Sequence, residues 1–310
     1  MSTNPPPLVA RGLLKRYGNL VAVDHVDLTV ATGDVFGYLG PNGAGKTTSL
    51  RMLLGLIRPT AGSIEVFGRD PLRVGVHALD GVAGFVEAPR FYPYLSGRRN
   101  LRLLADYDEP RTRGKVEEAL GLVELADRGN DRVGGYSHGM KQRLGIAAAL
   151  LRSPRLLLLD EPTTGLDPAG MRDMRELVRR LAAEGITVLL SSHLLTEVEE
   201  LCNRVAIIRK GRIVYEGSLA DLKQTGGHTW RLRATDPERA RTIALKHGVS
   251  DLALADGELS FTADDEAVAA LTVALGQAHI GITRLVAESA TLEELFLELT
   301  EPGEHLEAAA

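Results

Sequence analysis

The chain reads Gly40-Pro41-Asn42-Gly43-Ala44-Gly45-Lys46-Thr47-Thr48 between an apolar run at residues 35–39 and a helical pattern at residues 45–57. This stretch fits the pattern G-x-x-x-x-G-K-[ST], in which a glycine-rich turn joins a strand to a helix and cradles phosphate groups. Glycines let successive backbone N–H groups converge on phosphate oxygens, and the helix dipole adds positive charge there. We therefore expect a nucleotide site, with the Lys46 ammonium on the β- and γ-phosphates and the Thr47 hydroxyl on Mg²⁺.

Two acidic residues follow a second apolar run. Residues 156–159 are four leucines, typical of a strand buried on both faces of a parallel sheet, and Asp160 and Glu161 come next. Ligands bind at the carboxyl ends of such strands, so we expect both acids beside the phosphates. Neighbouring strand residues point in opposite directions, which favours Asp160 as a ligand of Mg²⁺ and Glu161 as the general base that polarises water. His193 follows the strand predicted at 187–191 and is expected at the same edge, as a donor to the γ-phosphate.

The first 220 residues alternate β-branched runs with helical patterns, which indicates an α/β fold with a parallel sheet. Further elements are expected as helices at 139–151, 168–184 and 194–202, and as hairpin strands at 205–208 and 212–215. Residues 229–287 then read strand, helix, strand, strand, helix, strand, the βαββαβ order of a ferredoxin-like domain. An amphipathic helix at 291–300 closes the pattern.

The segment Gln224-Thr225-Gly226-Gly227 is the best linker candidate in the chain. We therefore expect a nucleotide-binding domain at residues 8–224 and a small C-terminal α+β domain at residues 228–300. Residues 1–7 and 301–310 are expected to be disordered tails.

The composition is that of a soluble globular protein, with 44% hydrophobic and 25% charged residues. The net charge of −5 is unevenly spread. Residues 228–310 hold 6 Lys and Arg against 15 Asp and Glu, a net charge of −9, whereas the rest holds 30 against 26, a net charge of +4. This asymmetry supports two separate units, and neither is basic enough to indicate a nucleic-acid partner.

The sequence indicates a cytoplasmic chain that does not itself span a membrane. No apolar run approaches the roughly 20 residues that cross a bilayer, and the start, with Pro5-Pro6-Pro7, lacks the features of a signal peptide. The single cysteine, Cys202, excludes a disulfide framework and suits a reducing compartment. We expect Cys202 to be a small buried residue of a helix.

A third motif narrows the class of nucleotide-binding protein. The stretch Tyr136-Ser137-His138-Gly139-Met140-Lys141-Gln142-Arg143 opens a helix, and its serine lies 23 residues before Asp160. It resembles the signature motif of ABC ATPases, usually Leu-Ser-Gly-Gly-Gln. Gly165-Leu166-Asp167-Pro168 resembles the D-loop of that family, Ser192-His193 its H-switch, and Tyr17 the aromatic residue that stacks on adenine. The resemblance implies a P-loop ABC ATPase domain, with a mixed sheet core and a helical signature subdomain.

The resemblance also implies a shared site. In ABC ATPases two cassettes pack head to tail, and each ATP lies between one P-loop and the signature of the other subunit. Ser137, His138 and Gly139 would then grip a γ-phosphate bound in trans, at a helix N-terminus. Asp167 would couple the two sites, Glu161 would activate water, and His193 would position the γ-phosphate.

Two positions depart from the usual family pattern. Residues 82–89 place Glu87 where the Q-loop normally offers glutamine, and a glutamate still presents oxygen to Mg²⁺ or water. The signature carries Tyr136, His138 and Met140 in place of Leu, Gly and Gln. Both changes are similar to those of exporter cassettes of the bacitracin and daunorubicin resistance type, which also end in a small acidic domain.

The resemblance therefore implies the ATPase motor of an exporter at the cytoplasmic face of the membrane. Its partners would be a second cassette and separate membrane permease subunits, and no nucleic acid.

An importer motor is the first alternative, although importers often carry a larger, strand-rich regulatory domain. A soluble ABC ATPase of translation or DNA repair is the second. Translation types usually hold two cassettes, and repair types insert a coiled coil in a region where Ser137 follows Lys46 by only 91 positions in this chain. The transported substrate, and the choice between a homodimer and a heterodimer, cannot be read from these residues.

Overall fold

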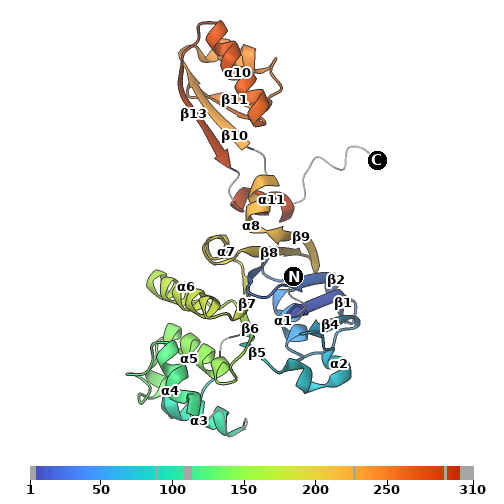
Figure 1. Ribbon diagram of the computed structural model, residues 1–310, viewed down its shortest axis with the longest axis vertical. Coiled ribbons are helices and arrows are strands. Elements are labelled where there is room, and N and C mark those ends of the chain that lie inside the picture. The colour runs from blue at the N-terminus through green and yellow to red at the C-terminus, as the bar shows by residue number, and fades with distance from the viewer. Residues whose placement is uncertain (1–4, 88, 108–113, 226–227, 290–291, 301–310) are drawn as a thin grey trace. The chain divides into compact units, whose positions relative to one another are not determined.

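The computed structural model of the protein describes residues 5–87, 89–107, 114–225, 228–289 and 292–300. The chain divides into two compact units, residues 1–217 and 218–310 (Figure 1). The expected tails at 1–4 and 301–310 lie outside the described residues. Among the residues of the predicted N-terminal tail that are described, the Pro7 carbonyl accepts a hydrogen bond from the Phe67 N–H at 3.1 Å.

The first unit is built on a six-stranded sheet in the order β5-β6-β7-β3-β8-β9. Its strands are β3 (Val35–Leu39), β5 (Val82–Phe85), β6 (Leu156–Asp160), β7 (Thr187–Ser192), β8 (Arg204–Arg209) and β9 (Arg212–Ser218). The pairs from β5 to β8 are parallel, as the leucine-rich runs predicted. All five residues of β6 are buried, because helices or other strands cover both faces of the sheet.

A second, antiparallel sheet makes the architecture of this unit mixed. It has the order β2-β1-β4, formed by β1 (Leu8–Tyr17), β2 (Leu20–Val30) and β4 (Ala61–Val66). Its inner residues join α1 and the strands of the larger sheet in one hydrophobic core. This core fixes the N-terminal β-region, and with it Tyr17, against the glycine-rich turn.

Helix α1 (Lys46–Leu53) is shorter than the sequence predicted. Gly55 adopts a left-handed φ of 69° and donates to the Met52 carbonyl, while the Leu56 N–H donates to the Arg51 carbonyl. These two bonds form a Schellman motif, which satisfies the last carbonyls of the helix and ends it. The expected extension to residue 57 is therefore wrong.

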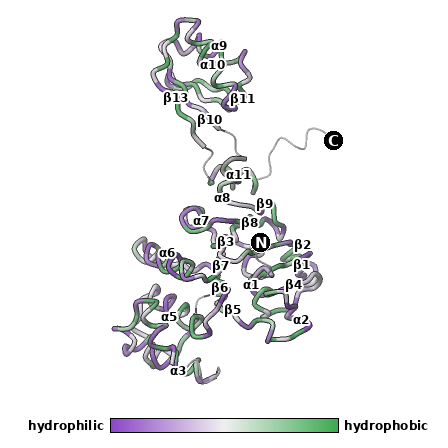
Figure 2. The backbone as a smooth tube through the Cα atoms, viewed as in Figure 1, coloured by the Kyte–Doolittle hydropathy of each residue, from purple (hydrophilic) through white to green (hydrophobic). Residues whose placement is uncertain are grey.

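The other helices of the first unit are α2 (Pro71–Val74), α3 (Gly97–Tyr107), α4 (Val116–Leu122), α5 (His138–Leu150), α6 (Pro168–Ala183) and α7 (Leu195–Leu201), with 3₁₀ turns at Val76–Leu79 and Val133–Gly135. Of these helices, α5, α6 and α7 lie close to the predicted ranges, whereas α2, α3 and α4 were not predicted. Helices α3, α4 and α5 pack on one another as a helical subdomain, and α5 also contacts β5 (Figure 1). Hydrophilic and hydrophobic residues are mixed along α6 (Figure 2). Its buried residues recur every three or four positions, so only one face of the helix is buried.

Cys202 lies directly after α7 and is 8% exposed. A side chain at Gly37 of β3 would meet its sulfur at 3.0 Å, so the thiol packs tightly against the central sheet. Burial raises the pKa of this thiol above its usual range. The expectation of a small, buried cysteine is thus confirmed, but its place in a helix is wrong, because Cys202 has extended backbone angles and caps the end of α7.

The second unit contains the predicted βαββαβ arrangement. Its elements are β10 (His228–Ala234), α9 (Pro237–Ala244), β11 (Ser250–Ala255), β12 (Glu258–Thr262), α10 (Asp265–Gln277) and β13 (Ile282–Ser289). The sheet order β11-β12-β10-β13, with every pair antiparallel, is that of a ferredoxin-like fold. Leu232, Phe261 and Leu271 lie in a core that contains residues of this unit alone.

Two further helices, α8 (Leu219–Thr225) and α11 (Leu292–Thr300), contact each other within the second unit. The unit therefore begins at Ser218, ahead of the linker predicted at 224–227. Thr225 still belongs to α8, and Gly226 and Gly227 lie outside the described residues. No helix in the described ranges is both long and apolar enough to cross a bilayer.

We expect Phe261→Ala to unfold the second unit selectively. Phe261 is 1% exposed, and truncation of a buried phenylalanine costs about 3–5 kcal/mol, a large part of the stability of so small a unit. Calorimetry should show one transition lost or strongly lowered, with the other transition and nucleotide binding unchanged. Val273→Ala, at a position of α10 that is 60% exposed, is the matched control. Loss of nucleotide binding in Phe261→Ala would contradict the independence of the two cores.

Candidate functional site

The glycine-rich turn runs from β3 to α1 and uses glycine for two physical reasons. Gly43 and Gly45 have φ values of 80° and 108°, which L-residues with a Cβ rarely adopt. A Cβ at Gly45 would also lie 2.5 Å from the Ala22 carbonyl oxygen, and one at Gly40 would lie 2.5 Å from that of Ile208. The backbone carbonyls of Ala22 and Ile208 thus lie so close to the turn that only glycine fits at Gly45 and Gly40.

A pocket of about 520 Å³ lies over this turn. It is lined by Tyr17, Leu20, Val21, Ala22, Asn42, Gly43, Gly45, Lys46, Thr47, Thr48, Glu161, Lys210 and Gly211. The structure therefore brings Tyr17 and Glu161 to the phosphate cradle, as the sequence predicted. Five lining residues carried no sequence signal as site residues, because only the packing of β2 and the β8–β9 turn places them there: Leu20, Val21, Ala22, Lys210 and Gly211.

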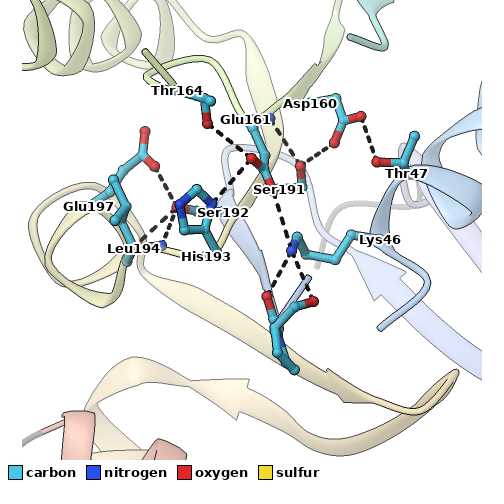
Figure 3. A network of polar contacts seen from close by, with 12 residues as sticks. Lys46, Thr47, Asp160, Glu161, Thr164, Ser191, Ser192, His193, Leu194 and Glu197 are labelled. Atoms are coloured by element: carbon cyan, nitrogen blue, oxygen red, sulfur yellow. Dashed lines mark hydrogen bonds and ion pairs between the residues drawn. The ribbon is translucent and has the colours of Figure 1, made fainter. Parts of the chain in front are cut away.

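Lys46 is held inside the turn that it serves. Its Nζ donates to the Gly40 carbonyl at 2.7 Å and to the Pro41 carbonyl at 3.3 Å, and it lies 3.3 Å from Glu161 Oε1. The side chain is only 5% exposed, so these oxygens replace water around the ammonium (Figure 3). Gly40, Pro41 and the 4% exposed Ala44 thus shape the cradle without lining the pocket.

Asp160 lies at the end of β6, directly opposite Ser191 of β7. Its Oδ2 accepts a hydrogen bond from the Thr47 hydroxyl at 2.9 Å, and its Oδ1 accepts one from the Ser191 hydroxyl at 2.5 Å (Figure 3). The predicted pair of oxygen ligands, Thr47 and Asp160, is therefore in contact. Ser191 was not predicted, since a serine inside an apolar strand gives no signal of its own.

Glu161 leaves the sheet through a left-handed turn, with a φ of 46°. Its N–H donates to the carbonyl and the hydroxyl of Ser191, at 3.2 and 3.0 Å. Its carboxylate then reaches three groups: Lys46, the Thr164 hydroxyl, which donates to Oε2 at 2.9 Å, and His193 Nδ1, 3.1 Å from the same oxygen.

These contacts determine the protonation of Glu161. Burial alone would raise the pKa of its carboxyl, but the hydrogen bond from Thr164 and the charges of Lys46 and His193 outweigh burial. The pKa therefore lies below its usual range, and the group is ionised at neutral pH. His193 does not line the pocket itself, and 35% of its side chain is exposed. An ionised carboxylate beside a histidine can accept a proton from water.

The signature residues lie elsewhere in the same chain. The Ser137 hydroxyl accepts a hydrogen bond from the Met140 N–H at 3.2 Å and caps α5, and Asp167 caps α6 through the Gly170 N–H at 3.0 Å. His138 Nε2 lies 3.1 Å from the Thr164 carbonyl oxygen. None of these predicted residues, nor Gly139, lines the pocket around Lys46.

Glu87 is not brought to the other predicted metal ligands. It has a left-handed φ of 68°, its side chain is 62% exposed, and its Oε1 forms an ion pair with Arg51 on α1. It does not line the pocket over the glycine-rich turn. In this structure Glu87 is thus paired with Arg51. For Glu87 to bind Mg²⁺, its side chain would have to leave Arg51 and turn toward Thr47 and Asp160.

Comparison with known proteins agrees with these features. The family model described as ABC transporter matches residues 23–164. The bacitracin transport ATP-binding protein BcrA of Bacillus licheniformis is 43% identical over 236 residues, which cover 76% of this chain and 77% of that protein. The daunorubicin/doxorubicin resistance ATP-binding protein DrrA of Streptomyces peucetius is 36% identical over 317 residues, which cover 97% of this chain and 94% of that protein.

The fold is also that of a solved protein. A structure described as the ATP binding subunit of an ABC transporter superposes with a TM-score of 0.62 and 30% identity, covering 70% of this chain and 92% of its own. The chain is therefore similar to BcrA and DrrA in sequence and to this solved ATP binding subunit in fold.

We expect Lys46→Ala to weaken nucleotide binding by about 10- to 100-fold, because it removes a charge-assisted contact of about 1.5–3 kcal/mol. Equilibrium titration of a fluorescent ATP analogue measures the effect. Lys246→Ala, a change at an exposed lysine of the second unit, is the matched control and should bind as the parent does. Equal affinities for Lys46→Ala and the parent would rule out the cradle.

Proposed function

Because the chain belongs to the ATP-binding subunits of ABC transporters, a family of ATPases, we propose that it is the motor of an exporter. The single observation that carries the proposal is the chain of contacts beside the glycine-rich turn. Lys46 and Glu161 line the pocket, Asp160 contacts the lining residue Thr47, and His193 contacts Glu161. ATP occupies this pocket, with its adenine on Tyr17 and its phosphates on the N–H groups of the turn.

The pocket supplies the parts that ATP hydrolysis needs. Thr47 and Asp160 offer two oxygens in contact with each other, a donor type that Mg²⁺ prefers, and these residues would hold Mg²⁺ together with phosphate and water oxygens. When bound, Mg²⁺ neutralises phosphate charge. Lys46 turns from the Glu161 carboxylate to the β- and γ-phosphates, which frees Glu161 to take a proton from the attacking water. His193 contacts the γ-phosphate.

The remaining groups come from a second cassette. The N-terminus of α5, with Ser137, His138 and Gly139, carries N–H groups that can bind an anion, yet it does not line the pocket of its own chain. Two cassettes packed head to tail place this end of α5 over the partner's γ-phosphate, and Asp167 of each subunit lies at the shared surface. ATP binding closes the pair, and loss of phosphate opens it.

Transport requires separate permease subunits in the membrane, to which the chain binds at the cytoplasmic face. Export is supported by the similarity to proteins named for bacitracin transport and daunorubicin resistance, which extends over the second unit in the case of DrrA. Co-expression and co-purification with a candidate permease tests this part. An exporter permease should be retained with the chain, and specific retention of an importer permease would overturn the direction of transport.

We expect Glu161→Gln to hydrolyse ATP at least about 10²-fold more slowly than the parent while binding it with similar affinity. The change removes the base but keeps the shape of the side chain, and general-base catalysis contributes about 10²–10⁴-fold. Phosphate release under ATP saturation measures the effect, with Glu266→Gln at an exposed site of α10 as the control. Turnover at the parental rate would sink the assignment of Glu161.

We expect Thr164→Val to move the acid limb of the pH–rate profile to higher pH. The hydroxyl of Thr164 stabilises the ionised form of Glu161, so its loss raises the pKa of that carboxyl, and the base becomes protonated at a higher pH. Profiles of kcat/KM for the parent and Thr164→Val are compared from mildly acidic to neutral pH. A limb at the same or a lower pH would contradict the contribution of Thr164.

We expect Ser137→Arg to abolish hydrolysis but to leave ATP binding to its own P-loop. Mixed with Lys46→Ala chains, it should recover part of the activity, because each mixed pair then holds one intact composite site. The rate is measured as a function of mixing ratio and total concentration. A rate per chain that does not depend on concentration, from chains that sediment only as monomers, would refute the shared site.

A further inference from the structure

Glu197 is a carboxylate that the proposed chemistry does not use. It lies in α7, one turn after His193, and it is 3% exposed, whereas Glu199 and Glu200 of the same helix face solvent. Its Oε1 has no hydrogen-bond partner among the described residues. An unpaired buried polar atom costs about 1–3 kcal/mol, so a carboxylate at this position needs a reason.

The other oxygen of Glu197, Oε2, binds the residue before His193, and this contact suggests why a carboxylate is buried here. The Ser192 hydroxyl, which is also buried, donates to Glu197 Oε2 at 2.5 Å and accepts a hydrogen bond from the Leu194 N–H at 2.9 Å (Figure 3). A serine hydroxyl carries one proton, so donation to the carboxylate leaves its lone pairs to the N–H of Leu194. The backbone on both sides of His193 is thereby fixed through Glu197.

This arrangement differs from an ordinary helix cap. Leu194 is the N-cap residue of α7 and Glu197 is the third residue of the helix, the position from which a glutamate usually binds the N–H of the cap directly. Here the Ser192 hydroxyl binds the N–H of Leu194 in place of Glu197. The Glu197 carboxylate instead binds that hydroxyl, which belongs to the residue before His193. Burial raises the pKa of Glu197 above its usual range, although the hydrogen bond from the Ser192 hydroxyl opposes this rise.

His193 depends on this support because its own side chain has little packing. It is 35% exposed, and its imidazole contacts the Glu161 carboxylate, with Nδ1 and Oε2 3.1 Å apart. The position of the imidazole is therefore set by the backbone that carries it. A displacement of about 1 Å at a reacting group can cost about 10²-fold in rate.

We propose that Glu197 is a positioning residue for His193, acting through Ser192, and this rests on the role of His193 in the proposed function. It follows that removing the Glu197 carboxylate should lower kcat without weakening ATP binding. A glutamine at this position still offers an oxygen to Ser192 and should preserve most of the rate.

The test compares purified full-length Glu197→Ala, Glu197→Gln, Ser192→Ala and Glu200→Ala. Glu200 pairs with Arg175 and Arg179 of α6 and serves as the matched control on the same helix. We expect kcat to fall about 10- to 100-fold in Glu197→Ala and Ser192→Ala, with the dissociation constant of ATP within about twofold of the parent. Glu197→Gln should lie within about threefold of the parental kcat, and Glu200→Ala should match it.

A spectroscopic readout separates positioning from a general loss of stability. The imidazole signal of His193, assigned in histidine-labelled protein by its absence in His193→Ala, should shift in Glu197→Ala and Ser192→Ala, and should stay in place in Glu200→Ala. An unmoved His193 signal, or an equal loss of rate in Glu197→Gln and Glu197→Ala, would overturn the proposal. If Glu197→Ala does not fold, Ser192→Ala carries the same test. Parental turnover in His193→Ala would instead overturn the role of His193 itself.

Discussion

The site depends on the parallel register of β3, β7 and β6. Leu39 lies opposite Ser192, and Asp160 lies opposite Ser191, so three strands end at one edge of the sheet. The glycine-rich turn, the acidic pair and His193 all lie at or directly after these strand ends. A slip of one residue would reverse the direction of every side chain along a strand, and the contacts of Asp160 with Thr47 and Ser191 would be lost together.

Burial of the leucine run holds that register. Residues 156–159 are at most 1% exposed, and full burial of a leucine side chain contributes about 1.5–3 kcal/mol. This apolar contribution offsets the cost of placing polar groups such as the Lys46 ammonium out of water. The same strand thus provides both the rigidity of the edge and, in its last residue, one of the groups that act there.

Most features that depend on local sequence were predicted, the end of α1 at Gly55 being an exception. The turn at Gly40–Thr48 needs glycine at positions that few other residues can occupy, and Asp167-Pro168 marks the start of α6 because a cap and an N1 proline follow each other. The βαββαβ order was also readable, since its strands and helices alternate with clear turns. Features that depend on distant contacts were not. The direction of Glu87 is set by Arg51, 36 residues away, and the support of Glu161 by Ser191 requires two strands to pair.

The single cysteine has a practical consequence. Because the thiol of Cys202 is packed against Gly37 and its pKa is raised, the thiolate that reacts with maleimides and iodoacetamides is scarcely populated. The natural chain therefore already behaves as a cysteine-free background. One cysteine placed at an exposed site, such as Tyr107 at 95% exposure, would carry a fluorophore or spin label alone. Distances between such labels on two copies could then follow their approach and separation during a cycle of turnover.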